Sequence, residues 1–290
     1  MSEWSGCAKR WMRSPELSSC IMKSSPRHAI KVIPGVVFAL AGFCSGAHGQ
    51  VADDPNDPSV TPYRPTVSNP ADLPAPGWLE AEFGGLRTLG EDQSRSDSVP
   101  WLLKYAFDEN HGLLLGGNSC VSSQAQGMPR QSGPGDTSLE WKQRFPLSDK
   151  VAFGIEAGVV APTAAHELGA GKPVWLVNGI FSADLGPLHL DLNLGDAHAS
   201  AHDATSSPWQ TTWAAAISRP LSADWGAALE LSGTHQRGAA TTSQVLAAIN
   251  YNLSHRFVLD SGMAYGLTRA AHDRSVFAGA TVLLGRVSGY

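Results

Sequence analysis

The stretch at 135–159 restricts the possible folds most, because apolar and polar residues alternate along it with a period of two. Leu139, Trp141 and Phe145 share one parity, and the positions between them carry charges of both signs. After a polar turn at 146–149 the alternation resumes, which predicts a β-hairpin. Its charged side is too polar for a packed core, and its apolar side is too continuous for a sheet that faces water. A transmembrane β-barrel, with hydrocarbon outside its wall and water inside, accommodates both sides.

The composition also favours strands over helices. Of the 290 residues only 16% are charged and 30 are glycine, which suits strands and turns. No apolar run reaches the roughly 18 residues that a membrane-spanning helix requires. The formal net charge of −5 and the lack of a basic patch argue against nucleic acid as a partner.

The first part of the chain resembles a secretory leader. A basic flank begins at Met22, an apolar stretch follows at 32–43, and small residues precede Gln50, as in a signal peptide cut before that residue. We therefore expect residues 1–49 to be a signal peptide region, with Met22 as an alternative translation start. Its removal would leave Cys120 as the only cysteine, which excludes an intramolecular disulfide framework.

The next segment, residues 50–77, is rich in proline, aspartate and asparagine. Proline lacks the N–H group that a strand needs for its ladder, so this segment is expected to be extended and unpaired. Two placements are compatible with this composition. The segment is either a flexible periplasmic lead-in or a plug that folds into the lumen and narrows it.

From Trp78 onward, alternation and turn residues predict about twelve strands. They span 78–88, 99–108, 112–121, 135–145, 150–161, 173–184, 187–196, 208–219, 224–235, 242–252, 256–266 and 275–287. Each is close to the ten or so residues that a tilted membrane strand requires. Short links alternate with longer polar ones, as in barrels with tight periplasmic turns and long external loops. The sequence thus predicts an all-β fold, a closed antiparallel transmembrane β-barrel over 78–290.

Parity then assigns residues to the two faces of the wall. Leucines at 188, 190, 192 and 194 illustrate the outward face, and aromatic residues near both strand ends predict two girdles at the water boundaries. In a soluble protein the same aromatic residues would form a core. Polar residues of the other parity would be costly in hydrocarbon, by roughly 2–4 kcal/mol for a Lys or Arg at the bilayer midplane. They are therefore expected to line the lumen. The predicted lumen-lining residues, and hence the solute pathway, are Glu80, Glu82, Lys104, Glu140, Lys142, Arg144, Glu156, Asp184, His189, Asp191, Asn193, Glu230, Asn250 and Asp260.

Two stretches resemble a known bacterial family. The run from Tyr63 to Glu80 and the strand opening Gly135-Asp136-Thr137 are similar to an outer-membrane group named for the MetA pathway of phenol degradation. The likeness extends over most of the chain that would remain after leader removal. It implies an outer-membrane barrel that transports hydrophobic or aromatic compounds. The family supplies no agreed binding residues to assign to this chain.

Motifs that could carry chemistry have simpler interpretations here. His189, Asp191 and Asn193 share one strand face, which is typical of a solvated lumen lining. His198 and His202 have a spacing that zinc sites use, but they lie in a Ser/Ala-rich loop without further ligands. No serine lies in a Gly-x-Ser-x-Gly nucleophile elbow. We therefore expect no catalytic residue, no metal site, no cofactor and no enzymatic activity.

These observations predict a monomeric channel in the outer membrane of a Gram-negative bacterium. Small molecules, aromatic or hydrophobic ones among them, would diffuse through its lumen. Its expected partners are outer-membrane lipids, a small-molecule solute and the barrel-assembly machinery. Two alternatives remain open: a barrel enzyme that modifies lipid, and a closed barrel that serves structure or interaction through its external loops.

Overall fold

The computed structural model describes residues 57–90, 93–165, 168–199, 207–269, 271 and 273–287. The predicted signal peptide region and the last three residues lie outside these ranges. In the part of the chain that is described, no helix is long and apolar enough to cross a membrane.

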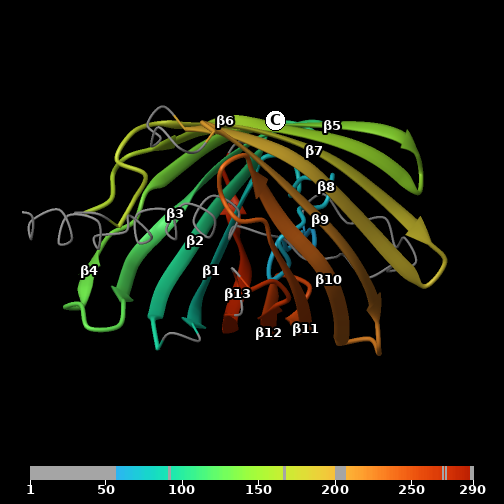
Figure 1. Ribbon diagram of the computed structural model, residues 1–290. Helices are drawn as coiled ribbons and strands as arrows, with labels where there is room; N and C mark the ends of the chain where they lie inside the picture. Colours follow the sequence, from blue (N-terminus) through green and yellow to red (C-terminus); the bar gives the residue numbers. More distant parts are fainter. Residues whose placement is uncertain are drawn as a thin grey trace, which may run out of the picture.

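A single antiparallel sheet closes on itself to form the molecule (Figure 1). The described strands are β1 (Trp78–Leu89), β2 (Arg95–Ala106), β3 (His111–Gln124), β4 (Gln131–Gly133), β5 (Thr137–Ser148), β6 (Val151–Ala161), β7 (Val174–Leu185), β8 (Leu188–Ala199), β9 (Trp209–Pro220), β10 (Trp225–Gln236), β11 (Thr242–Ser254), β12 (Phe257–Gly266) and β13 (Arg274–Arg286). Neighbours in sequence pair around the ring, and β1 pairs with both β2 and β13. Twelve of the strands make the closed barrel that the sequence predicts, and β4 is additional.

The hairpin of β5 and β6 has the two faces that its alternation predicts. Trp141 pairs with Ala157 on one face, and Lys142 pairs with Glu156 on the other. Lys142 is fully buried, whereas Trp141 is 42% exposed. Because paired residues of an antiparallel ladder lie on the same face, the pattern places charge inside the ring and apolar side chains outside it.

The first external connections differ from the prediction. β2 begins at Arg95 rather than at 99. β3 extends to Gln124 and pairs with the short strand β4, in a region where the sequence predicts a loop. These extensions consist mainly of polar residues and therefore show no alternation of apolar and polar positions, although their backbone groups still pair across the ladder.

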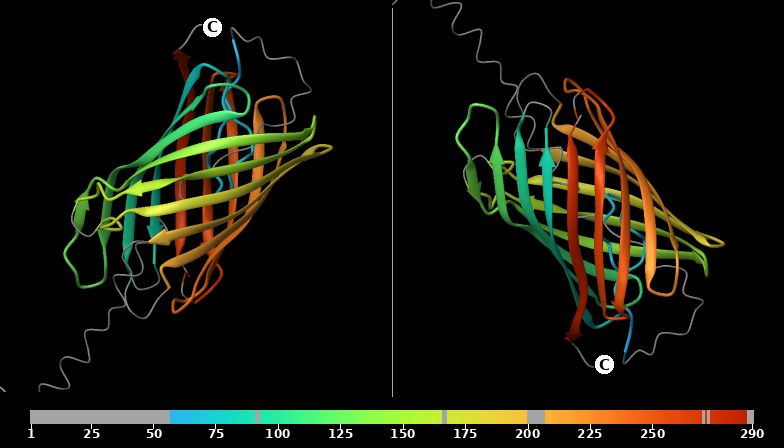
Figure 2. Two further views of the ribbon diagram at one scale, coloured as in Figure 1. Left: turned by 90° about the horizontal axis from the view of Figure 1, so that it is seen from above. Right: turned by 90° about the horizontal axis from the view of Figure 1, so that it is seen from below.

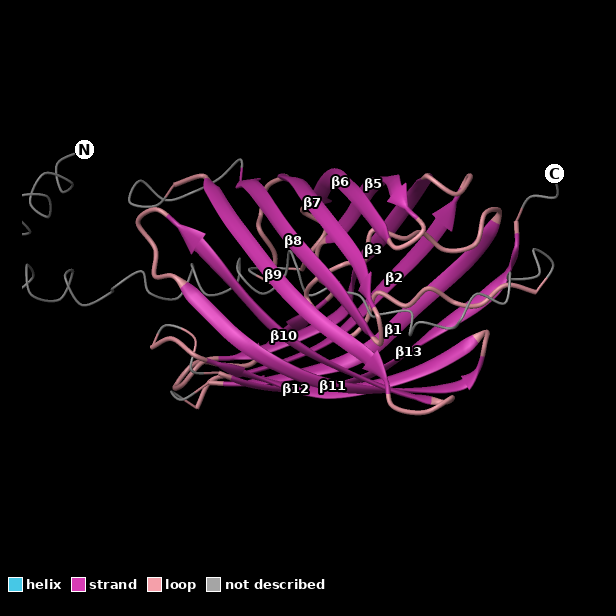
Figure 3. Cartoon of the chain, turned by 90° about the vertical axis from the view of Figure 1, so that its right-hand side faces the viewer, coloured by secondary structure: helices cyan, strands magenta, loops and turns pink. Residues whose placement is uncertain are grey.

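Large apolar side chains cover the outer surface of the ring. Leu194 is 65% exposed, Leu229 is 54% exposed and Met263 is 64% exposed, values that a folded core would not leave. Aromatic residues lie at both ends of the strands. Trp209 begins β9 at the long-loop end, and Trp225 begins β10 after a short turn, with its ring tilted against that of Tyr251. Figure 3 shows that the strands of the wall are tilted and that the loops lie at its two ends.

Residues 57–77 run inside the ring, and we name them the plug segment (Figure 2). Tyr63 and Ala71 from this segment are both fully buried. Tyr63 packs with Leu102 and Leu114, and Ala71 packs with Ala152 and Ile180 of the wall. The interior of the barrel is therefore built from the wall and the plug segment together.

Candidate functional site

The plug segment starts and ends at the short-turn end of the barrel. At its start, His255 Nε2 lies 2.9 Å from Asp57 Oδ1, and Val60 N donates to His255 O over 2.8 Å. The hydrogen bond from His255 lowers the pKa of Asp57. At its end, Gly77 N donates to Ala106 O over 2.8 Å. The segment is thus a loop inserted into the lumen from one side.

Two carboxylates of β1 hold the first part of the plug segment by its backbone. Thr61 N donates to Glu80 Oε2 over 2.8 Å. Tyr63 N and Arg64 N donate to the two oxygens of Glu82 over 2.5 and 3.1 Å. A proline-rich chain cannot pair in a ladder, so its buried N–H groups need other acceptors. The wall supplies them as charged oxygens, which make the stronger hydrogen bonds.

Buried lysines neutralise these wall carboxylates. Lys104 Nζ lies 2.5 Å from Glu80 Oε1 and 2.6 Å from Glu82 Oε1. Lys142 Nζ lies 3.0 Å from Glu156 Oε1. Lys104 and Lys142 are fully buried, and the three carboxylates are at most 2% exposed. Charges removed from water in this way are tolerated only when they are paired and hydrogen-bonded.

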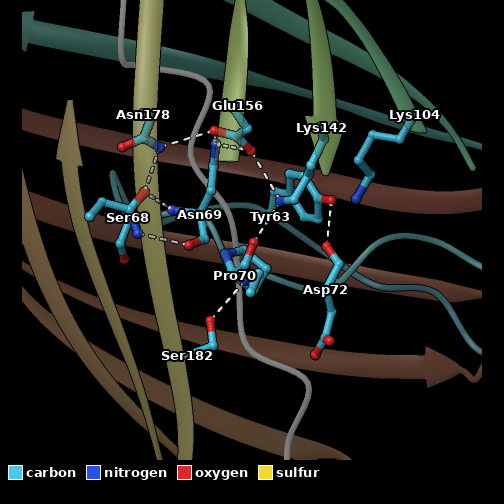
Figure 4. A network of polar contacts seen from close by, with 12 residues as sticks. Tyr63, Ser68, Asn69, Pro70, Asp72, Lys104, Lys142, Glu156, Asn178 and Ser182 are labelled. Atoms are coloured by element: carbon cyan, nitrogen blue, oxygen red, sulfur yellow. Dashed lines mark hydrogen bonds and ion pairs between the residues drawn. The ribbon is translucent and has the colours of Figure 1, made fainter. Parts of the chain in front are cut away.

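The same two lysines flank the ring of Tyr63 (Figure 4). Lys104 Nζ lies 3.9 Å from the ring centroid, and Lys142 Nζ lies 4.0 Å from it. Leu102 and Leu114 complete the surroundings of the ring. Cation–π attraction is stronger in such a desolvated position than at a surface. Tyr63 is therefore the main side-chain anchor of the plug segment.

The middle of the plug segment crosses to the opposite wall. Arg64 Nε lies 3.1 Å from Asp260 Oδ2 of β12. Further along, Val67 N and Ser68 N donate to Glu230 Oε2 of β10 over 2.7 and 2.8 Å, and Ser68 Oγ donates to the same oxygen over 3.1 Å. Glu230 is only 1% exposed. Its carboxylate thus binds the plug segment through one oxygen that accepts three hydrogen bonds.

Asn69 and Pro70 then contact the strands on the β5–β8 side (Figure 4). Asn69 N donates to Asn193 Oδ1 over 2.9 Å, and Asn193 Nδ2 donates back to Asn69 O over 2.8 Å. Asn69 Nδ2 donates to Glu156 Oε2 over 2.8 Å. Lys142 Nζ donates to Pro70 O over 2.6 Å. The plug segment has by this point contacted the barrel wall on several sides.

A chain of polar groups continues from the plug segment to the short-turn rim. Ala71 N donates to Ser182 Oγ over 2.8 Å, and Ser182 Oγ donates to Asp191 Oδ1 over 2.5 Å. His189 lies between Asp191 and Asp184, with its Nδ1 2.6 Å from Asp184 Oδ1. The hydroxyl of Ser182 therefore bonds a carboxylate and not the imidazole. This arrangement supports the backbone of the plug segment and does not activate a serine nucleophile.

Eleven of the fourteen predicted lumen residues are buried in the structure: Glu80, Glu82, Lys104, Lys142, Glu156, His189, Asp191, Asn193, Glu230, Asn250 and Asp260. Glu140, Arg144 and Asp184 are partly exposed. Arg144 Nε lies 2.7 Å from Asp72 Oδ1 of the plug segment. Nine of the fourteen bond directly to the plug segment: Glu80, Glu82, Lys104, Lys142, Arg144, Glu156, Asn193, Glu230 and Asp260.

Sequence reasoning missed two wall residues that take part in this site. Asn178 Nδ2 donates to Glu156 Oε2 over 3.0 Å, and Ser182 binds the backbone of Ala71. Both share the parity of Asp184 on β7, so the alternation that found Asp184 could have found them. Within the described residues, no group of three or more His, Cys, Asp or Glu could hold a metal ion.

Comparison with known proteins rests on structure. No family model matches the sequence. No curated protein matches it either. Among solved structures, the COG4313 outer membrane channel from Pseudomonas putida F1 superposes with a TM-score of 0.59 at 13% identity, over 74% of this chain and 98% of that one. The KdgM porin in complex with disordered oligogalacturonate superposes with a TM-score of 0.50 at 10% identity, over 71% of this chain and 99% of that one. The chain therefore has the barrel fold of outer-membrane channels.

Proposed function

We propose that the protein is an outer-membrane channel of a Gram-negative bacterium, through which small solutes pass by diffusion. The closed ring with apolar side chains outside and ionisable ones inside carries this proposal. In hydrocarbon every backbone polar group needs an internal partner, and a closed barrel provides one for each. The long loops then lie on the extracellular side of the membrane, and the short turns lie on the periplasmic side.

The plug segment is the obstacle that a solute meets in this channel. It bonds to wall residues on β1, β5, β8, β10 and β12, so the lumen is occupied by the protein's own chain (Figure 2). Both of its ends lie at the short-turn end. Passage therefore requires the segment to shift within the lumen or to withdraw toward the periplasm. The residues that hold the segment in place form the solute pathway after it has moved.

The surroundings of Tyr63 support small aromatic or hydrophobic molecules as solutes. The wall receives a phenol side chain between two ammonium groups and next to Leu102 and Leu114. A solute ring of similar size would find the same contacts once the plug segment has moved. The resemblance of the run from Tyr63 to Glu80 to the family named for phenol degradation agrees with this solute class.

Liposome swelling tests the channel directly. We expect purified protein to make liposomes permeable to small sugars, and a variant with residues 60–72 replaced by a Gly/Ser stretch of equal length to make them more permeable. A Gly/Ser stretch keeps the reach of the chain but loses the contacts of the Tyr63 ring and the ion pair of Arg64. Its greater backbone entropy also weakens the main-chain hydrogen bonds that remain. A variant with the same replacement at 125–130, in the connection after β3, serves as the control. Impermeable liposomes with both the native and the replaced plug segment would contradict the proposal.

The charge of the predicted pathway gives a second measurement. It contains eight acidic side chains against three lysine or arginine side chains and one histidine: Glu80, Glu82, Glu140, Glu156, Asp184, Asp191, Glu230 and Asp260 against Lys104, Lys142, Arg144 and His189. We expect the plug-replaced channel to prefer cations, seen as a reversal potential in a salt gradient. Glu230→Gln should reduce this preference, whereas Asp97→Asn on the outer face should not. An anion-selective channel would show that other groups control permeation.

A further inference from the structure

Arginine side chains gather on the outer face of the barrel at the long-loop end. On β1, Glu80 and Glu82 are buried inside, so the residues of odd number point outward. Phe83 is 48% exposed on this outward face. Arg87 follows four residues later, and its side chain is 50% exposed. An arginine thus stands on the outward face above the apolar belt.

The register of the sheet aligns further arginines with this position. Leu89, one outward position above Arg87, pairs with Arg95 of β2 on one side and with Arg274 of β13 on the other. Arg130, in the connection between β3 and β4, donates through Nε to Ser122 Oγ over 2.5 Å. We name Arg87, Arg95, Arg130 and Arg274 the arginine face. With neighbouring strands about 4.8 Å apart, it spans roughly 15 Å of the rim.

Arginines outnumber carboxylates on the arginine face at the strand positions that the structure describes. Among the outward positions that the structure describes on these strands, Asp97 is the one carboxylate. Its Oδ1 lies 2.6 Å from Arg87 Nε, and its Oδ2 lies 2.6 Å from a terminal nitrogen of Arg95 and 4.0 Å from one of Arg130. Each guanidinium has five N–H donors, so Asp97 can occupy only a few of them. Among the described residues of these strands, Asp97 thus orients the arginines but cannot accept from all of their N–H groups.

The rows below the arginine face are apolar. Val99 and Trp101 of β2 occupy the next outward positions toward the midplane, and Phe83 pairs with Trp101. Elsewhere on the same rim, tryptophan residues occupy outward positions. Trp175 and Trp209 are 58% and 55% exposed there. The cationic sector is therefore local, and it lies where the hydrocarbon belt gives way to water.

We propose that the arginine face binds the phosphate groups of the glycolipid that forms the outer leaflet of this membrane. The inference rests on the proposed outer-membrane location. Guanidinium groups bind phosphate through paired hydrogen bonds, and they do so best at a boundary where water is partly excluded. A glycolipid whose acyl chains lie against Phe83 and Val99 brings its headgroup phosphates to the level of Arg87 and Arg274.

Native mass spectrometry of the purified protein with added lipid A tests this inference. We expect Arg87→Gln/Arg274→Gln to weaken lipid A binding by about tenfold or more, since each arginine near an anionic lipid surface contributes roughly fivefold in affinity. The matched control is Lys172→Gln/Arg237→Gln, which removes the same charge from exposed residues of other loops. The control should bind lipid A as the native protein does.

Three outcomes would overturn the inference: native affinity in the first double variant, equal losses in both double variants, or equally tight binding of dephosphorylated lipid A. Inorganic phosphate should compete only at far higher concentration than lipid A, because it lacks the acyl chains that contact the apolar rows. Conductance of the same variants in planar bilayers is measured in parallel. A conducting variant that has lost lipid A separates this inference from the proposed channel function.

Discussion

A disulfide between the plug segment and the barrel wall should close the channel. In a Cys120→Ser background, Ala71→Cys and Gly154→Cys place two thiols in suitable positions. A Cβ at position 154 would lie 3.4 Å from Ala71 Cβ, close to the separation of about 3.5–4.5 Å that disulfides require. We expect oxidised protein to leave liposomes as impermeable as protein-free ones, and a reductant to restore the native rate of swelling.

The single variant Ala71→Cys, treated with the same oxidant, controls for effects of the substitution alone. Formation of the cross-link is followed by mass spectrometry of peptides from β6 and the plug segment. If the cross-linked protein swells liposomes as fast as the reduced protein, the plug segment does not control the pathway. Solutes would then pass beside it, through a route that its movement does not affect.

Removing the charge of Lys104 should destabilise the barrel strongly. Lys104→Met leaves the carboxylates of Glu80 and Glu82 buried without a cation, and such a broken pair costs about 3–5 kcal/mol of unfolding free energy. The comparison is Arg87→Met, whose pair with Asp97 is half exposed and contributes about 0–1 kcal/mol. Urea unfolding of the refolded proteins in lipid vesicles, followed by tryptophan fluorescence, measures both.

A rescue variant distinguishes charge from packing. Lys104→Met combined with Glu80→Gln and Glu82→Gln removes the uncompensated charge and keeps amide oxygens that can still accept hydrogen bonds from Thr61 and Tyr63. We expect it to recover most of the lost stability. If Lys104→Met costs no more than Arg87→Met, the buried ion pairs do not hold this part of the barrel together.

The barrel itself was largely predictable from the sequence. Alternation identifies a strand wherever oil and water lie on opposite sides of it, and the hairpin with Trp141 and Lys142 follows this rule. The rule fails at β4 and at the start of β2, because those residues are polar on both faces and stand above the apolar belt. Periodicity detects a contrast between two environments and therefore cannot detect strands that water surrounds.

The contacts of the plug segment were not predictable in the same way. Its prolines indicate that it cannot join a ladder, but they do not indicate which acceptors its N–H groups will find. The partners of Ser68 and Asn69 lie on β10 and β8, more than one hundred residues away in the chain. Only closure of the ring brings Glu230 and Asn193 to the same interior. The polar wall residues can be recognised in the sequence, but their binding partners depend on the closed fold.

The wall recognises the plug segment mainly through its main chain. The N–H groups of residues 61, 63, 64, 67, 68, 69 and 71 all donate to wall side chains. Every amino acid except proline carries this donor. Single exchanges of side chains other than those of Tyr63 and Arg64 should therefore leave these main-chain hydrogen bonds in place. An insertion or deletion, by contrast, would shift each later N–H donor away from its acceptor. The number of residues between these donors therefore matters more than the identity of their side chains.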